Sequence, residues 1–332
     1  MINYCTRIDI PKSPFDINYR DRLMFLGSCF TEHIGMKMKE HGWEVCINPF
    51  GVLYNPSAVA SGCKRLLNPE PFVESDLFEY NGLFHSYMHH GKFSGHSAAD
   101  VLTEINNTLS VTADCFSKIS CLVITFGTAY AYRLKSDGRT VANCHKLPAG
   151  HFERALLTVS QIVDEWSAAL DNLFAVNASV KVIFTVSPVR HLKDGAHGNQ
   201  LSKSILLLAE QALTDKYAGR LFYFPAYELM MDELRDYRFY ADDLLHPSKV
   251  AVDYIWERFC DMYMDTGVKD DLKEVESVLR DVSHRPFHQS TDLHKQFLLQ
   301  TFNKIKRLQA KNPYICLSKE ESEIASRLQN LT

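Results

Sequence analysis

The chain has 332 residues, of which 46% are hydrophobic and 23% charged, and its formal net charge at pH 7 is -4. This composition is typical of a globular protein with a sizeable core, and neither the charge nor any basic tract favours a nucleic-acid partner. No apolar run approaches the roughly 18 residues of a membrane span, and the N-terminus lacks the apolar segment of a signal peptide. We therefore expect a cytoplasmic protein with no nucleic-acid and no membrane partner. Its nine cysteines include no C-x-x-C pair, so we expect reduced thiols rather than a zinc site.

Strand and helix patterns alternate along the chain. Residues 22–27 form a short apolar run typical of a strand. The helix predicted after it carries Phe30, Ile34 and Met38 at a spacing of four and stops near Gly42. Further strands are predicted at 43–51, 121–127 and 180–188, with a possible fifth at 220–230, and further helices at 158–175, 201–216 and 248–264.

This alternation predicts an α/β fold with a mostly parallel sheet that is covered on both faces. The runs at 121–127 and 180–188 are rich in β-branched and apolar residues on both sides, as expected for buried parallel strands. In such sheets, ligands bind beyond the carboxyl ends of the strands. Side chains that follow these strands are therefore the first candidates for a functional site.

Three segments depart from the alternation. Residues 52–100 are irregular and rich in aromatic residues and histidine, and residues 130–146 resemble a hairpin that turns at residues 136–138. After about residue 265 the chain is helical and charged. We predict one domain over residues 1–264 and a C-terminal helical extension over 265–332. The apolar positions of the extension fit either a core or a dimer face, so a homo-oligomer through these helices is possible.

The segment RLMFLGSCFTEHIG, residues 22–35, places a serine and a thiol where a strand passes into a helix. A serine hydroxyl is a weak nucleophile until a base, itself oriented by a carboxylate, takes its proton. The segment YADDLLHPS, residues 240–248, offers both groups, because Asp243 and His246 are three residues apart and one helical turn would place them on one face. Asp243 would then orient His246 and leave its second ring nitrogen for Ser28.

Each of these residues also has a plainer interpretation. Ser28 could be an N-cap, a position that favours serine, and this role is compatible with catalysis. Cys29 could be the nucleophile, although it falls one residue late and is expected to turn toward the helix packing side. Asp242 lacks the three-residue spacing to His246 and is expected to be a solvated neighbour.

The motifs GSCF, TVSPVRH and DYRFYADDLLHPS occur in this order and resemble the GSCFA family, a branch of the SGNH/GDSL hydrolase superfamily. The resemblance covers roughly residues 20 to 260. It implies a three-layer α/β/α flavodoxin-like fold with a parallel sheet of about five strands, and serine esterase or related acyl-transfer chemistry. By this resemblance Ser28 is the nucleophile, His246 the general base and Asp243 its orienter, and neither a metal nor an organic cofactor is needed.

The resemblance also implies an oxyanion hole, formed by the N–H of Ser28, a glycine N–H after the second strand and an asparagine after the third. Gly51 matches the glycine. The third position departs from the pattern, because Gly127 is present but Thr128 follows it and the asparagine is missing. The predicted hairpin would bring Asn143 back beside the strand that follows Gly127. We therefore predict that Asn143, or otherwise Thr128, supplies the third contact.

Two further groups of residues are candidates for substrate binding. The segment FHSYMHHGKFSGH contains four histidines, which fit a polar loop, a metal site or a substrate-binding loop. We favour substrate binding for His85 and His89 and expect no metal. Arg190 and His191 follow a strand end and should face the crevice, where Arg190 fits either a carboxylate or phosphate on the substrate or a structural ion pair.

Together these observations predict a serine esterase that hydrolyses a short-chain acyl ester, with acetyl as the expected acyl group, on a carbohydrate or small metabolite through an acyl-Ser28 intermediate. Two alternatives stay open. An O-acyltransferase would use the same three residues and differ only in its acceptor. A non-catalytic ligand-binding module on a retired hydrolase fold is the other, and the altered third oxyanion position favours it mildly.

Overall fold

The computed structural model describes residues 6–286 and 292–330. The described residues form two compact units that are interleaved in sequence. The first consists of the described parts of Met1–Ile10, Arg22–Gly35 and Cys46–Trp256, and the second of Pro11–Asp21, Met36–Val45 and the described parts of Glu257–Thr332. The predicted domain boundary after residue 264 stays a prediction.

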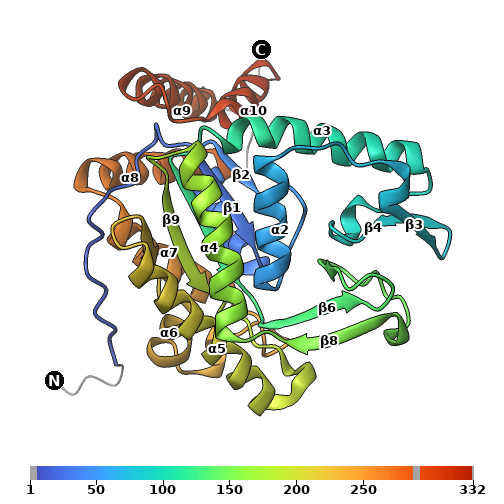
Figure 1. Ribbon diagram of the computed structural model, residues 1–332. Helices are drawn as coiled ribbons and strands as arrows, with labels where there is room; N and C mark the ends of the chain where they lie inside the picture. The colour runs from blue at the N-terminus through green and yellow to red at the C-terminus, as the bar shows by residue number, and fades with distance from the viewer. Residues whose placement is uncertain (1–5, 287–291, 331–332) are drawn as a thin grey trace. The chain divides into compact units, whose positions relative to one another are not determined.

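The first unit contains the predicted parallel sheet, with strand order β10-β9-β5-β1-β2 (Figure 1). β1 pairs with β5, β5 with β9 and β9 with β10, all in parallel. The α/β fold with about five strands is therefore confirmed. The strand bounds are Leu23–Gly27 for β1, Val45–Ile47 for β2, Cys121–Phe126 for β5, Lys181–Val186 for β9 and Leu221–Tyr223 for β10.

The central strands are buried on both faces because both of their side-chain rows are apolar. Every residue of β1 and β5 is buried, and one row, which includes Met24, Ile124 and Phe184, joins the main core with side chains from the covering helices. Figure 1 shows α2 and α4 side by side in front of the sheet. The helices of this unit, two of which continue into the second, are α1 Cys29–Glu40, α2 Pro56–Leu67, α3 Ala98–Phe116, α4 Val159–Val176, α5 Gly195–Lys216, α6 Ala226–Glu228 and α7 Lys249–Tyr263.

Two expectations about local structure were wrong. The segment expected to be irregular, 52–100, contains α2, which begins with Asn55 as N-cap and Pro56 at the first helical position, a common helix start. The possible strand 220–230 ends at Tyr223, since Pro225 lies where a continued strand would need an N–H donor.

Two small antiparallel sheets interrupt the main alternation. β3 (Leu77–Tyr80) pairs with β4 (Leu83–Ser86), and a second sheet has the order β7-β6-β8, where β6 is Tyr130–Leu134, β7 Thr140–Val141 and β8 Phe152–Leu156. The predicted hairpin is confirmed by the pairing of β6 with β7, whereas β8 was not predicted. The N–H of Ala142, just after β7, donates to the carbonyl of Tyr87, just after β4, over 2.8 Å, so the two sheets are joined.

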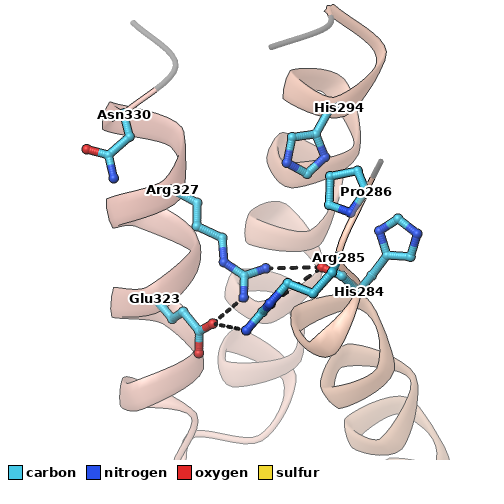
Figure 2. Close-up of a pocket in the computed structure, with 7 residues that line it drawn as sticks. All are labelled: His284, Arg285, Pro286, His294, Glu323, Arg327 and Asn330. Carbon is cyan, nitrogen blue, oxygen red and sulfur yellow. Dashed lines mark hydrogen bonds and ion pairs between the residues drawn. The ribbon is translucent and has the colours of Figure 1, made fainter. Parts of the chain in front are cut away.

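The second unit is helical after residue 264, with α8 (Thr266–Ser283), α9 (Asp292–Lys311) and α10 (Ser318–Gln329), which confirms the C-terminal helical extension. Figure 2 shows a pocket in this unit where Arg285 and Arg327 both reach Glu323 of α10. Two arginines thus share one carboxylate, and the described residues that line the pocket include no serine, threonine or cysteine. Within 6–286 and 292–330, no helix is both long and apolar enough to cross a membrane.

Gly27 ends β1 in a conformation that only glycine adopts readily. Its φ angle is +137°, and a Cβ atom built on it would lie 2.2 Å from the carbonyl oxygen of Thr125 on β5. Its N–H donates to Oδ1 of Asn48 over 2.9 Å, and its carbonyl accepts from the N–H of Leu53 over 2.9 Å. Gly27 thus joins β1 closely to β5 and to the loop after β2, directly before Ser28.

We therefore expect Gly27→Ala to lower the free energy of unfolding by about 3 kcal/mol or more, because it adds both backbone strain and a clash with Thr125. Gly138→Ala is the matched control. Gly138 also has a positive φ, +76°, but a Cβ there would meet no atom within 4 Å, so only about 1 kcal/mol should be lost. Urea unfolding measures both values, and equal losses would contradict the predicted clash.

Candidate active site

Ser28 lies between the end of β1 and the first residue of α1. Its side chain is 1% exposed, and its Oγ has no hydrogen-bond partner among the described residues. An N-cap serine would accept a hydrogen bond from an N–H two or three residues further on, and Ser28 Oγ does not do so here. The plainer interpretation of Ser28 as a cap is therefore not supported, and its hydroxyl is left for another role.

Asp243 and His246 form the predicted acid–base pair. Nδ1 of His246 lies 2.6 Å from Oδ2 of Asp243, and Oδ1 of Asp243 accepts the N–H groups of Leu245 and His246, both over 2.9 Å. The expected helical turn was wrong, because Leu244 has a φ angle of +59° and the segment is a tight turn closed by the Asp243 carboxylate. These N–H donors and the His246 side chain lower the pKa of Asp243 to about 2.

The turn is attached to the end of β9 on the side where Ser28 lies. The N–H of Arg190, four residues after β9, donates to the carbonyl of Leu245 over 3.3 Å. His246 is also close enough to two other histidines to act on them electrostatically. Burial and the charge of His246 lower the pKa of His33 on α1, and burial, Lys203 and His246 lower the pKa of His191 to about 4.

These contacts place His246 facing both α1, which begins directly after Ser28, and the segment after β9. Two of the three predicted catalytic residues, Asp243 and His246, are hydrogen-bonded to each other. The hydrogen bond between Ser28 Oγ and His246 is not made in this structure, because Ser28 Oγ has no partner. Catalytic hydrogen bonds are often long in the absence of substrate and tighten when it binds.

The backbone donors predicted for the oxyanion hole are all hydrogen-bonded within the protein. The N–H of Ser28 donates to Thr125 over 3.2 Å, and that of Gly51 to Asn48 over 2.7 Å. Gly51 has a φ of +76°, and a Cβ on it would lie 2.3 Å from Cβ of His90, so a glycine is required there by the close approach of the His90 loop.

The N–H groups that follow β5, the third strand of the predicted pattern, are also hydrogen-bonded within the protein. The N–H groups of Gly127 and Thr128 both donate to the carbonyl of Tyr54, over 2.8 and 2.9 Å, and the hydroxyl of Thr128 lies 3.1 Å from that of Ser202. In this structure no predicted backbone donor is therefore free for an oxyanion. Their role as oxyanion donors stays a prediction that requires a change on substrate binding.

The placement predicted for Asn143, beside the strand that follows Gly127, stays a prediction. The β6–β7 ladder ends with Tyr132 opposite Val141, and the same register continued by two residues would set Asn143 opposite Tyr130. The N–H of Asn143 donates to the carbonyl of Tyr87 over 3.4 Å, and its Oδ1 accepts the N–H of His145 over 2.8 Å. Asn143 therefore shapes the turn after β7 in this structure, and its role as an oxyanion donor stays a prediction.

The substrate-binding role expected for His85 and His89 stays a prediction, and in this structure both side chains are buried within the β3–β4 region. The ring nitrogens of His85 lie 2.6 Å from Oγ of Ser94 and 3.2 Å from the carbonyl of Tyr80. His89 is 2% exposed, and its Nδ1 lies 2.9 Å from Oγ of Ser86. Burial lowers the pKa of His89 to about 3, as expected for a neutral core histidine.

Arg190 and His191 lie close to the turn that carries His246. The structural ion pair considered for Arg190 is not present among the described residues, and both Nε of Arg190 and Nε2 of His191 are buried without a hydrogen-bond partner. Buried polar atoms without partners are uncommon in proteins. Arg190 and His191 therefore stay candidates for contacts with the substrate.

Cys29 is less suited than Ser28 to be the nucleophile. Burial raises the pKa of its thiol, and the N–H of Phe30 only partly offsets this effect. The reactive form of cysteine is the thiolate, which a raised pKa makes scarce. No group of three or more His, Cys, Asp or Glu side chains in the described part of the chain is arranged to hold a metal ion.

Sequence reasoning missed two residues of the site, His33 and Lys203. His33 lies one helical turn after Cys29 on α1. Lys203 is 1% exposed and lies on the buried face of α5 with Leu206, Ala209 and Leu213. A lysine within an apolar helical stripe is an unusual pattern, and this was the signal that could have identified it.

The model of the GSCFA family matches residues 22–259. The chain belongs to the GSCFA family. A second model, described as GSCFA domain protein, C-terminal domain, matches residues 275–330. The family predicted from the motifs around Ser28 and His246 is thus confirmed, and no curated protein matches the chain.

Two solved structures are similar to this GSCFA protein at low identity. One is a carbohydrate esterase family 3 protein from Talaromyces cellulolyticus, with 10% identity and a TM-score of 0.35 over 77% of this chain and 99% of that chain. The other is the acetyl xylan esterase Est2A from Butyrivibrio proteoclasticus, with 9% identity and a TM-score of 0.36 over 76% of this chain and 64% of that chain. At these TM-scores the likeness carries no argument about function.

The Asp243 turn leads to a prediction about pH. Because the folded state lowers the pKa of Asp243 from 3.8 to about 2, this carboxylate stabilises the fold above pH 3.8, and that contribution is lost as the pH falls through about 2. NMR titration of the Asp243 side chain should give a midpoint near 2 in the native protein. In His246→Ala the midpoint should rise but stay below 3.8, since the two backbone donors remain.

Asp242→Asn is the matched control, and it should leave the Asp243 titration unchanged. A midpoint of 3.8 for Asp243 in the native protein would show that the turn does not form in solution.

Proposed function

We propose that this GSCFA protein is a serine esterase that uses Ser28 as nucleophile and His246 as general base. The observation that carries the proposal is the combination of a buried serine hydroxyl with no partner and a formed Asp243–His246 pair. A serine that is neither a cap nor part of a hydrogen-bond network has no structural reason for its hydroxyl, and buried hydroxyls are normally bonded.

In the proposed reaction, Oγ of Ser28 attacks the ester carbonyl carbon while its proton passes to Nε2 of His246. Asp243 accepts Nδ1–H of His246 and stabilises the imidazolium that forms. His246 then protonates the leaving alcohol, which gives an acyl-Ser28 intermediate. Water, activated by the neutral His246, attacks this intermediate and releases the acid and the free serine.

The first step requires a rearrangement, because Ser28 Oγ is buried and not bonded to His246. The Tyr54 carbonyl holds the N–H groups of Gly127 and Thr128, and an ester oxyanion would compete with that carbonyl for them. We propose that substrate binding exchanges one of these internal hydrogen bonds for a bond to the oxyanion.

The surroundings of Ser28 favour a short acyl group. A Cβ atom on Gly127 would lie 3.3 Å from Cβ of Ser28 and 2.9 Å from the carbonyl oxygen of Tyr54. Gly127 and the Tyr54 carbonyl therefore leave no room for an added methyl group on this side of Ser28. We propose an acetyl ester as substrate, with a carbohydrate or small metabolite as the alcohol.

The first test is labelling by a fluorophosphonate probe, followed by mass spectrometry of the intact protein. We expect one adduct on Ser28 in the native protein and none in Ser28→Ala or His246→Ala. Asp243→Asn should label about 100-fold or more slowly, because His246 loses the group that fixes its tautomer.

Asp242→Asn is the matched control for Asp243→Asn, and it should label like the native protein. Cys29→Ala separates the two candidate nucleophiles and should also label normally. An adduct that moves to Cys29 would overturn the role of Ser28. No adduct on the native protein would favour the ligand-binding module, for which the closed Ser28 and the occupied oxyanion donors are the supporting observations.

The second test concerns acyl size and uses p-nitrophenyl esters of increasing chain length. We expect kcat/KM for acetate to exceed that for octanoate by at least about 10-fold, since the backbone of Gly127 and Tyr54 crowds Ser28 and disfavours a long chain. Equal values would contradict the short-acyl proposal. Addition of a sugar acceptor to the same assay distinguishes transfer from hydrolysis, because an acyltransferase would release p-nitrophenol faster and form the acylated sugar.

A further inference from the structure

Lys203 is a buried lysine that neither the motifs nor the proposed mechanism uses. It lies on α5, is 1% exposed, and makes no ion pair among the described residues. Burial of a lysine without a carboxylate partner is costly. The protein therefore tolerates an unfavourable group at this position, and its neighbours indicate why.

The Lys203 side chain joins the carboxyl ends of two central strands. Its Nζ donates to the carbonyl of Gly127, directly after β5, over 2.7 Å, and to the carbonyl of Ser187, directly after β9, over 2.6 Å. Both residues are buried, so without Lys203 both carbonyls would need another donor. Lys203 thus holds the ends of β5 and β9 at a fixed separation.

One of these two strand ends is in contact with the proposed nucleophile. A Cβ atom on Gly127 would lie 3.3 Å from Cβ of Ser28, so the backbone of Gly127 borders the side chain of Ser28. The other strand end leads to Arg190, whose N–H holds the turn that carries His246. Through these two carbonyls Lys203 acts on the positions of both Ser28 and His246.

The electrostatic surroundings of Lys203 include the site itself. Burial and, to a smaller extent, the charge of Arg190 lower the pKa of Lys203 to about 7, and the Cys29 thiol acts in the opposite direction. Lys203 also lowers the pKa of His191. From α6, the ring of Tyr227 lies 5.6 Å from Nζ. Among these neighbours no permanent negative charge compensates the ammonium.

We propose that Lys203 is a positioning residue for the Ser28 reaction: its amine fixes the strand ends beside Ser28, and its positive charge favours the negative charge that develops during attack. This inference rests on the proposed function. It also explains how the site can lack the asparagine of the oxyanion hole, because the positive charge of Lys203 would stabilise the oxyanion in place of that neutral donor.

Geometry and charge can be separated by pH. A neutral amine keeps two N–H donors, which is enough for the two carbonyls, so deprotonation removes the charge and leaves the hydrogen bonds possible. If Lys203 acted only through its hydrogen bonds, the reaction rate would therefore be the same with the charged ammonium and with the neutral amine. A lysine that also acts through its charge makes the reaction slower above pH 7.

The test measures the second-order rate of fluorophosphonate labelling of Ser28 between pH 5.5 and about 9. In the native protein we expect the rate to fall as the pH passes about 7, where Lys203 loses its proton. Lys203→Met should label about 100-fold more slowly at low pH, as for a misplaced reacting group, and should lack the alkaline decrease. Lys216→Met, on the same helix but exposed, is the matched control and should follow the native profile.

Each outcome decides the proposal. A constant ratio of native to Lys203→Met rates across the pH range would reduce Lys203 to a structural role, and a ratio of one would remove its role altogether. If Lys203→Met does not fold, Lys203→Gln and the native profile replace it, and a native rate with no alkaline decrease overturns the charge effect. Absence of labelling in the native protein at every pH would instead show that the proposed function has failed.

Discussion

The close approach of β1 to β5 at Gly27 is the constraint on which the site depends. With no side chain at Gly27, the backbone turns at a φ of +137° within reach of Thr125, and Ser28 follows at the carboxyl end of a central strand. The same turn is held from the other side by Asn48 and Leu53. A serine placed in this way has a fixed backbone and a side chain that no cap or network uses.

The remaining groups of the site are positioned by backbone hydrogen bonds rather than by side-chain packing alone. Asp243 closes its own turn with two N–H groups and so presents His246 in one orientation. Arg190 attaches that turn to β9, and Lys203 ties β9 to β5. A series of hydrogen bonds to main-chain groups therefore links His246 to Ser28 through the ends of β9, β5 and β1. The two side chains themselves are not hydrogen-bonded to each other.

Much of this arrangement could be predicted from local sequence patterns. Apolar runs identified the central strands, and the spacing of Asp243 and His246 identified the acid–base pair even though the segment is a turn and not a helix. What failed were features set by tertiary contacts. The hydrogen bond from Asn143 to Tyr87 was not predicted, and the burial of Lys203 depends on strand ends that lie 76 and 16 residues away along the chain.

The central claim is that Ser28 carries the acyl group of the substrate. The most direct measurement is acid quenching of the protein within its first turnovers on p-nitrophenyl acetate, followed by peptide mass spectrometry. We expect one acetyl group on the peptide that contains Ser28, absent in Ser28→Ala and accumulated in a variant that slows deacylation. Release of p-nitrophenol with no acetyl group on Ser28, or with the acetyl group on Cys29 or Lys203, would contradict it.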